Sequence, residues 1–444
     1  MQEIALSLLI FTPLLAAFVG LFLPTQMSGT FRYLALSVNS VQLFVLVSVL
    51  MAYQHGAGLQ FVEYTPWITL SLGDWGILKA AYFVGVDGLS LPLVALSVVI
   101  LLIATISSWQ VTRQPKGYFL LLLLLNAAIM GSFTALDFLL FYLFFEFMLL
   151  PMFFLIALWG GPRREYASIK FFLYTLVGSI FILIAMIALY ISMQENVGST
   201  EVVHSFNLIK MRDWANYLPG SILLPEHAWR LGPFDARQWC FLLLFFGFAI
   251  KLPMVPVHTW LPDAHVEAST PVSVLLAALL LKIGGYGLLR IAFPLFPDAA
   301  MYFGSFVAWM GVLSIIYGGL NAMSSKDLKR MIAYSSVSHM GFVLVGISSA
   351  TAEGVTGSVY QMFSHGILSA MLFLLAGVIY DRTHDRTIDH YSGLYQKMPV
   401  YTVFVLIGFF ASLGLPGFAS FIGEVLIFLG AFKSNAVGGP LHER

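Results

Sequence analysis

Residues 241–262 read FLLLFFGFAIKLPMVPVHTWLP, an apolar segment with a single lysine, Lys251, near its middle. A helix that crosses a bilayer needs about 20 predominantly apolar residues, so the segment is long enough to span one. Lys251 lies about ten residues, or about 15 Å along a helix axis, from either end of the segment. Pro253 and Pro256 follow within two turns, and each removes one helix hydrogen bond. The segment therefore predicts a membrane helix that is broken beside a buried charge.

The composition of the whole chain agrees with a lipid surrounding. Of its 444 residues 59% are hydrophobic and 10% are charged, whereas a soluble domain carries about 25% charged residues. Lys+Arg and Asp+Glu are both 22, and this balance gives no sign of a nucleic-acid partner. The one cysteine, Cys240, can neither ligate an iron–sulfur cluster nor form an internal disulfide.

Apolar runs of membrane-spanning length recur along the chain, and they predict an all-α polytopic membrane protein. Two longer polar segments, 54–83 and 194–239, are expected to be loops on the outside. The spans are expected at 4–23, 31–53, 84–109, 117–135, 136–160, 168–193, 240–261, 270–292, 301–323, 329–350, 356–380 and 399–432, twelve in all.

The basic residues predict the orientation of the chain. All but two of the 22 Lys and Arg residues fall in loops or at helix ends. The larger share lies on the side that faces inside when the N-terminus is outside, as the positive-inside rule requires. The two exceptions are Lys251 and Lys282, both near the middle of a span.

Ionisable residues lie at mid-depth in six of the predicted spans. A charge at the centre of a membrane helix costs about 2.5–3.5 kcal/mol on insertion scales, so several of them need pairing or internal water. We identify them as candidate proton-transfer residues: Glu146, Lys251, Lys282, His339, His365 and Glu424, with His258 as a weaker candidate.

Roles without proton transfer also remain open for these residues. A lysine can snorkel to the interface, although the position of Lys251 is too deep for its stem. A static ion pair could hold helices together, and a membrane histidine can simply bond a neighbouring helix. Two histidines could also hold a haem, but His339 and His365 lie in no recognisable haem context. A proton or ion path accounts for the charges best.

A second broken helix is predicted at residues 412–421, SLGLPGFASF, where Pro416 frees the carbonyl of Ser412. In the first break, the prolines are expected to free the carbonyls of Ala249 and Leu252. Broken helices in the two halves of a transporter indicate a binding site and inverted repeats. Spans four to eight would form one unit of five helices. Because five is an odd number of membrane crossings, the next unit would have the inverted orientation in the membrane.

Long motifs in this sequence resemble the antiporter-like subunits of respiratory complex I. The resemblance is carried by KLPMVPVHTWLPDAHVEASTPVSVLLAALLLKIGGYGLLR (251–290), SSKDLKRMIAYSSVSHMGF (324–342) and QMFSHGILSAMLFLLAGVIYDRT (361–383). Two further stretches, 82–94 and 133–161, resemble one chain type of this family in particular. The similarity runs from the first helix to about residue 432.

The resemblance implies a role for each candidate residue. Glu146 matches the fifth-helix glutamate that pairs with the seventh-helix lysine, here Lys251. Lys282 matches the eighth-helix lysine of a central relay, and His339 and His365 match relay or connecting histidines. Glu424 matches a twelfth-helix glutamate that is a lysine in the sister chains.

The resemblance also implies four regions. They are residues 1–116 with the first three helices, 117–292 as the first repeat, 293–432 as the second repeat, and an atypical tail at 433–444. The family has fourteen helices, whereas the last nine residues, AVGGPLHER, do not resemble it. Helices 13 and 14 are therefore expected to be missing, which would leave the second repeat incomplete.

The expected function is that of a proton-translocating membrane-arm subunit of NADH–quinone oxidoreductase. The chain itself would hold no cofactor and no metal and carry out no redox chemistry, and NADH, FMN, iron–sulfur clusters and quinone would bind elsewhere in the complex. The expected partners are other membrane-arm subunits, especially the sister antiporter-like chains L and N. The expected location is a bacterial cell inner membrane, with the mitochondrial inner membrane as the less favoured alternative. The alternatives are a subunit of a multisubunit sodium/proton antiporter, a membrane hydrogenase subunit, or a non-conducting truncated scaffold.

Overall fold

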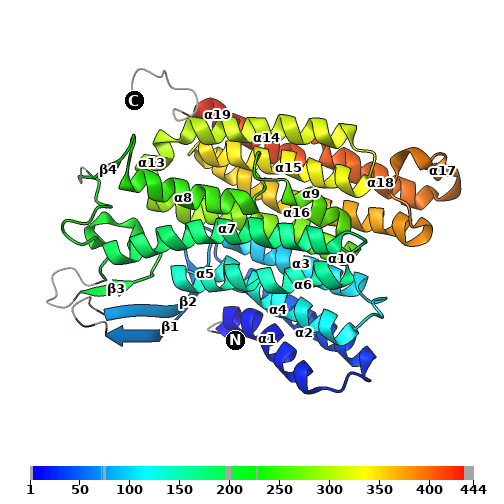
Figure 1. Cartoon of the computed structure of the whole chain (residues 1–444), viewed down its shortest axis with the longest axis horizontal. Helices are drawn as coiled ribbons and strands as arrows, with labels where there is room; N and C mark the ends of the chain where they lie inside the picture. The colour runs from blue at the N-terminus through cyan, green and yellow to red at the C-terminus, as the bar shows by residue number, and fades with distance from the viewer. Residues whose placement is uncertain (1–3, 72, 74–76, 196–201, 227–228, 435–444) are drawn as a thin grey trace.

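The computed structural model describes residues 4–71, 73, 77–195, 202–226 and 229–434, and it is a bundle of long helices with a small β-sheet at one end (Figure 1). Within these ranges, ten helical segments are long and apolar enough to cross a membrane. The predicted all-α membrane fold is confirmed, and ten of the twelve expected spans correspond to these segments.

The helices follow one another along the chain, with the two longest connections between α2 and α3 and between α7 and α8. Those of the first half are α1 (Ala5–Phe22), α2 (Ser28–Ala52), α3 (Ser90–Ser107), α4 (Pro115–Thr134), α5 (Phe138–Phe147), α6 (Leu149–Trp159) and α7 (Arg164–Ser192). Those of the middle are α8 (Ala236–Lys251), α9 (Trp260–Glu267), α10 (Thr270–Leu275), η5 (Leu276–Leu280), α11 (Leu281–Gly287), η6 (Leu288–Ala292), α12 (Phe293–Leu295) and α13 (Pro297–Tyr302). Those of the last part are α14 (Gly304–Ser324), α15 (Leu328–Ser348), α16 (Ala352–Thr383), α17 (Leu394–Lys397), α18 (Pro399–Ser412) and α19 (Ala419–Lys433).

The two remaining spans are divided, as the prolines predict. The span expected at 240–261 ends as α8 at Lys251, and the chain resumes a helix only in α9. The span expected at 399–432 consists of α18 and α19, which are separated by residues 413–418. A third interruption, which the sequence did not predict, lies at Met148 between α5 and α6, three residues before Pro151.

The outside loop expected at 54–83 contains a β-hairpin, and the predicted start of the third span at residue 84 is wrong. Strands β1 (Gln60–Ser71) and β2 (Ile77–Val86) pair antiparallel, and β3 (Val203–Ser205) pairs parallel to β2. The apolar end of β2 continues into the hydropathy of α3, which hides the boundary between them. Asp87 marks that boundary, because its Oδ1 accepts hydrogen bonds from the N–H groups of Leu89 and Ser90.

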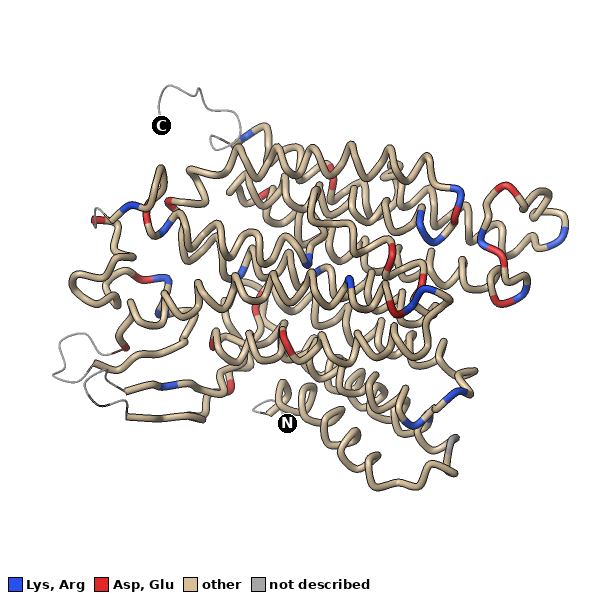
Figure 2. Tube along the Cα trace, in the orientation of Figure 1, with Lys and Arg blue, Asp and Glu red and all other residues tan. Residues whose placement is uncertain are grey.

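Lys and Arg gather at the two ends of the helices, and a few lie in the middle of the bundle (Figure 2). Three that the sequence pattern assigned to loops or helix ends are in fact buried, namely Arg237, Arg290 and Lys329. Arg237 forms an ion pair with Asp298, and Lys329 donates to the carbonyl of Ala268 at 2.8 Å. Placement in loops or at helix ends therefore accounts for fewer basic residues than we expected from the sequence.

A buried amide network joins the first four helices. Asn126 of α4 exchanges two hydrogen bonds with Gln42 of α2, at 2.8 and 2.9 Å, and donates to Asn39 Oδ1. Gln42 also donates to the carbonyl of Leu9 in α1, and Asn39 donates to Thr105 Oγ1 in α3. Because each amide is paired, these polar groups join the helices inside an apolar bundle.

We expect the substitution Asn126→Leu to destabilise this four-helix part by about 1–3 kcal/mol, because it leaves buried amide groups of Asn39 and Gln42 without partners. Thermal unfolding of the detergent-solubilised protein would measure the loss. The matched control is Ser40→Ala on the exposed face of α2, which is expected to change stability by less than about 0.5 kcal/mol. Equal melting temperatures for the two variants would contradict the network's role.

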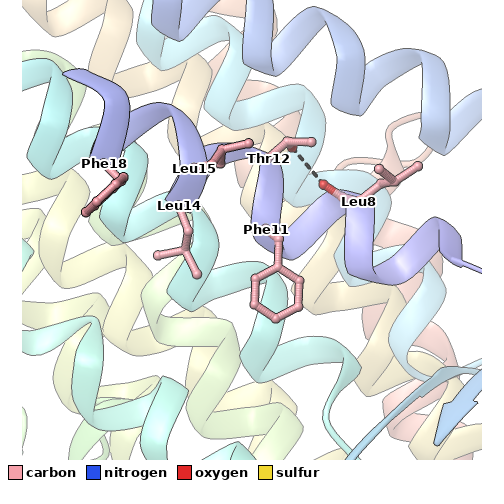
Figure 3. A pocket seen from close by; sticks show the side chains of 6 residues that line it. All are labelled: Leu8, Phe11, Thr12, Leu14, Leu15 and Phe18. Carbon is pink, nitrogen blue, oxygen red and sulfur yellow. Dashed lines mark hydrogen bonds between the residues drawn. The ribbon is translucent and has the colours of Figure 1, made fainter. Parts of the chain in front are cut away.

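A shallow apolar groove of about 430 Å³ lies on α1 and is lined by Leu8, Phe11, Thr12, Leu14, Leu15 and Phe18 (Figure 3). Thr12 donates to the carbonyl of Leu8 in its own helix at 2.7 Å. Leu15 and Phe18 are exposed, as expected for a helix face that meets lipid tails. None of the lining residues belongs to the row of ionisable side chains described below.

Candidate functional site

Lys251 is the last residue of α8, and its side chain is 1% exposed. Its ammonium group donates to the carbonyl of Phe145 at 3.3 Å and lies 3.6 Å from the centre of the Phe145 ring. A ring face attracts a cation electrostatically, and the attraction is strongest where water is excluded. The buried charge is thus held by a carbonyl and a π face of α5.

The backbone around the break is satisfied by side chains as well as by the main chain. Trp260 donates its indole N–H to the carbonyl of Ile250 at 2.9 Å, and the N–H of Val255 donates to Ser314 Oγ at 3.0 Å. The carbonyl of Ala249, which we expected to be free, accepts from the N–H of Met254 at 3.0 Å instead. The expectation was wrong for Ala249, because the chain after Pro253 turns back toward it.

Glu146 lies in the last turn of α5, next to the interruption at Met148. Its Oε1 is buried and accepts no hydrogen bond in the described part of the chain. The expected ion pair with Lys251 is not formed between these two described residues, since Lys251 binds the carbonyl of the preceding residue, Phe145. Glu146 therefore lies on α5, the helix that contacts Lys251, but it forms no ion pair with Lys251.

Lys282 is fully buried in α11, directly after the π-helical turn η5. Its ammonium group donates to the carbonyl of Ala277 at 2.5 Å and lies 2.7 Å from Nδ1 of His365. Such wide turns occur frequently at functional sites, and they loosen the regular helix bonding. Close to Lys282, Gly284 packs against the backbone of α8, where a Cβ atom would lie 2.6 Å from the N–H nitrogen of Leu252.

Two histidines continue the row beyond Lys282. His365 of α16 and His339 of α15 are both buried, and their ring centroids are 5.1 Å apart. His339 Nε2 lies 3.1 Å from Ser412 Oγ, at the end of α18. Lys282, His365, His339 and Ser412 therefore form a continuous polar series from the middle of the bundle to the second broken helix.

Glu424 of α19 lies at this second break. Its carboxylate packs against Gly414, where a Cβ atom would collide with a carboxylate oxygen. Gly414 has a φ of +70° and Gly417 a φ of +99°, so both positions favour glycine. Glu424 is half-buried, and the described residues offer it no hydrogen-bond partner.

His258 lies within the first break, between α8 and α9, and stands apart from the series. Its ring is in edge contact with Tyr317, at 5.1 Å between centroids, and in tilted contact with Tyr334, at 6.2 Å. The structure therefore joins Lys282, His365 and His339, and leaves His258 among aromatic side chains.

Sequence reasoning missed two buried polar residues beside the row. His265 of α9 is fully buried, stacked on Phe373 at 4.5 Å, and has no hydrogen-bond partner in the described residues. Gln361 of α16 is fully buried next to His339. The HVEAS segment and the spacing of Gln361 four residues before His365 were visible signals for them.

The side chains of the row are of types that can transfer protons. Lysine, histidine and carboxylate side chains exchange protons, and hydroxyl groups such as Ser412 both donate and accept. No group of three or more His, Cys, Asp or Glu residues suited to a metal ion is found among the described residues. A series of such proton-exchanging side chains inside a membrane protein is the arrangement found in proton relays.

Known proteins with similar sequences share one family. Residues 135–439 match the family described as NADH:quinone oxidoreductase/Mrp antiporter, TM. The chain is 40% identical over 440 residues to NADH-quinone oxidoreductase subunit M of Rickettsia bellii, covering 97% of this chain and 83% of that protein. It is 42% identical over 436 residues to subunit M of Rhodobacter capsulatus, covering 97% and 81%.

Two solved structures have the same fold. A chain of respiratory complex I from Thermus thermophilus with bound NADH matches 98% of this chain and 83% of its own length, with a TM-score of 0.80 and 29% identity. A chain of the membrane-bound sulfane sulfur reductase, an archaeal respiratory membrane complex, matches 98% and 84%, with a TM-score of 0.78. Its sequence identity is 22%, so that likeness bears on the fold alone.

Proposed function

Since this chain belongs to the membrane family that unites NADH:quinone oxidoreductase subunits with Mrp antiporters, we propose that its buried row of ionisable residues carries the protons pumped by such an oxidoreductase. The family resemblance inferred from the motifs is confirmed. The chain is a counterpart of subunit M and a proton-translocating membrane-arm subunit. The observation that supports the role of the row is the unbroken contact from Lys282 through His365 to the break at Ser412.

Each residue would have a distinct part in the transfer. Lys251 and Glu146 would form a charge pair that opens and closes, because the structure holds Lys251 on Phe145 and leaves Oε1 of Glu146 without a hydrogen-bond partner among the described residues. Loss of a nearby carboxylate favours release of a proton from a buried lysine. Lys282, His365 and His339 would receive and pass the proton, and Glu424 would deliver it to the outside-directed path. His258 would have at most an accessory part.

The chain acts within an assembly. It is a subunit of an oxidoreductase complex, and other subunits of the membrane arm are its partners. We propose that the sister antiporter-like chains L and N contact it, that NADH, FMN, iron–sulfur clusters and quinone bind elsewhere in the complex, and that the membrane is a bacterial inner membrane. The four regions 1–116, 117–292, 293–432 and 433–444 remain part of this proposal, and residues 435–444 of the tail lie outside the described residues.

The test uses the assembled complex in proteoliposomes. We expect Lys251→Met and Glu146→Gln to lower the number of protons pumped per electron, while NADH oxidation continues through subunits that these changes do not touch. Glu165→Gln, an exposed acid at the start of α7, is the control and should pump as the wild type does. An unchanged ratio of protons to electrons in both variants would contradict the proposal.

The family description also includes antiporters, and the same preparation separates the two functions. Proton flux that depends on sodium and needs no NADH would indicate an antiporter subunit. Normal assembly, with pumping insensitive to Lys251, Glu146, Lys282 and Glu424, would indicate a non-conducting scaffold. We expect neither result.

A further inference from the structure

Gln361 is a fully buried amide that none of the roles above includes. It lies on α16, one turn before His365, and its Nε2 is 3.3 Å from Nδ1 of His339. Its Oε1 is buried and has no hydrogen-bond partner among the described residues. The amide nitrogen therefore contacts His339, and the amide oxygen has no hydrogen-bond donor among the described residues.

The space around this amide is narrow on the side of α19. A Cβ atom at Gly423 would lie 2.6 Å from Gln361 Oε1, so the absence of a side chain there makes room for the amide. Gly423 directly precedes Glu424 in the chain. Gln361 thus lies between His339 and the backbone next to the last carboxylate of the row.

The hydrogen-bond polarity of this site determines the tautomer of His339. An amide nitrogen only donates, so Nδ1 of His339 must accept, and in the neutral ring the proton is then on Nε2. That N–H points to Ser412 Oγ at 3.1 Å, the group at the end of α18. His365 has the same polarity, because the Lys282 ammonium donates to its Nδ1.

Protonation of His339 would reverse the hydrogen-bond polarity at Nδ1 and leave that at Nε2 unchanged. A proton arriving at Nδ1 turns that nitrogen into a donor, and it can no longer face the Gln361 Nε2 group. A half-turn of the amide would present Oε1, which is the acceptor that now lacks a partner. The proton on Nε2 could then pass to Ser412 Oγ as this hydroxyl releases its own proton onward along the path proposed to end at Glu424, and the ring would return to neutral with its remaining proton on Nδ1.

We propose that Gln361 is a positioning residue for the relay, whose amide fixes neutral His339 as the Nε2–H tautomer and turns when His339 becomes protonated. This inference rests on the proposed function, since it assigns a direction to one step of the row. After each transfer the ring holds its remaining proton on Nδ1, so the histidine is reset only when it loses that proton and takes up another at Nε2; the amide then turns back, because Nδ1 is an acceptor again. The step moves a proton in at Nδ1 and a proton out at Nε2, so charge is conserved.

The test compares two substitutions that differ in hydrogen-bond polarity. Gln361→Glu keeps the shape but offers only acceptors when ionised, and it should hold a proton on Nδ1 of His339. Gln361→Leu removes both groups and should leave His339 without a preferred tautomer. Gln396→Glu, at an exposed position on α17, adds the same charge away from the relay and serves as the control.

Two measurements on the assembled complex in proteoliposomes decide the outcome. Solid-state NMR of ¹⁵N-labelled histidine, with the His339 signal identified by its loss in His339→Gln, reports the tautomer. We expect Nε2–H in the wild type and in Gln396→Glu, and Nδ1–H in Gln361→Glu. The rate of proton pumping should fall at least about tenfold in Gln361→Glu, since an incorrect tautomer costs a catalytic histidine up to about 10⁴-fold elsewhere.

The two proposals can fail separately. A wild-type His339 protonated on Nδ1, or a tautomer that Gln361→Glu leaves unchanged, would overturn the role of Gln361 even if pumping depends on the row. Pumping that does not respond to Lys251, Glu146 or Lys282 would overturn the function of the row even if the tautomer follows Gln361. Normal assembly of Gln361→Leu, judged by the amount of complex in the membrane, excludes misfolding as the cause of a lower rate.

Discussion

Replacement of Lys282 by alanine is expected to slow proton-coupled turnover of the complex by about 10²-fold or more, which is the contribution of a positioned proton donor or acceptor. Lys282 is fully buried, and its ammonium group joins the carbonyl of Ala277 in the π turn η5 to His365. Without it, Ala277 O and His365 Nδ1 both lose their partner. The measurement is the rate of proton uptake into proteoliposomes together with the rate of NADH oxidation.

The control for this prediction is Lys326→Ala, which removes an exposed lysine between α14 and α15. It should leave both rates within about twofold of the wild type, because exposed charges contribute little free energy. Lys282→Met fills more of the vacated space than alanine and should be just as slow, since it restores volume without a proton. Normal pumping in Lys282→Met would show that the row needs only packing at this position.

Most of the fold could be predicted from the sequence, because the bilayer sets a minimum length for every apolar run. The helix α7, predicted at 168–193, is found at Arg164–Ser192, and α10 to α12 begin at residue 270 as predicted. The β-hairpin could not be predicted in this way. The end of its strand β2, residues 80–86, is apolar like the helix that follows, and the pairing with β1 distinguishes the two.

The candidate site was predicted less completely, for a physical reason. A charge in an apolar run is visible in sequence, so Lys251, Lys282 and Glu146 could be identified from single residues. Partners depend on where separate helices meet, and the sequence alone indicated neither the contact of Lys251 with Phe145 nor that of Lys282 with His365. The broken helices were expected from their prolines, whereas the π turn before Lys282 has no such marker.

Arg290 and Asp87 show how a buried charge can serve structure rather than transfer. Arg290 of η6 donates to both carboxylate oxygens of Asp87, at 2.6 and 2.8 Å, and its Nε donates to Tyr286 Oη at 3.1 Å. Tyr286 in turn donates to the carbonyl of Phe133 in α4. The group connects the start of α3 with α4 and η6, at the end of the bundle where the β-sheet lies (Figure 1).

Removal of Asp87 from this pair is expected to destabilise the protein by about 3–5 kcal/mol, because it leaves the Arg290 charge buried without a carboxylate partner. Burial alone would raise the pKa of Asp87, but the Arg290 guanidinium outweighs it and holds the pKa below the usual value. A lowered pKa means that the pair stabilises the fold fully above about pH 3.9, and that this contribution is lost as the pH falls below that value.

Thermal unfolding of Asp87→Ala in detergent, at neutral pH and at successively lower pH, measures both effects. At neutral pH the variant should melt well below the wild type, and the difference should narrow under acidic conditions as Asp87 becomes protonated in the wild type.

The double variant Asp87→Ala with Arg290→Met should recover much of the loss, since two apolar side chains replace a buried ion pair at little cost. Asp389→Ala, at an exposed acid of the loop between α16 and α17, should melt as the wild type does. If the single and double variants were equally unstable, the loss would come from the missing cap on α3 rather than from the unpaired guanidinium, because Asp87 also accepts from the N–H groups of Leu89 and Ser90.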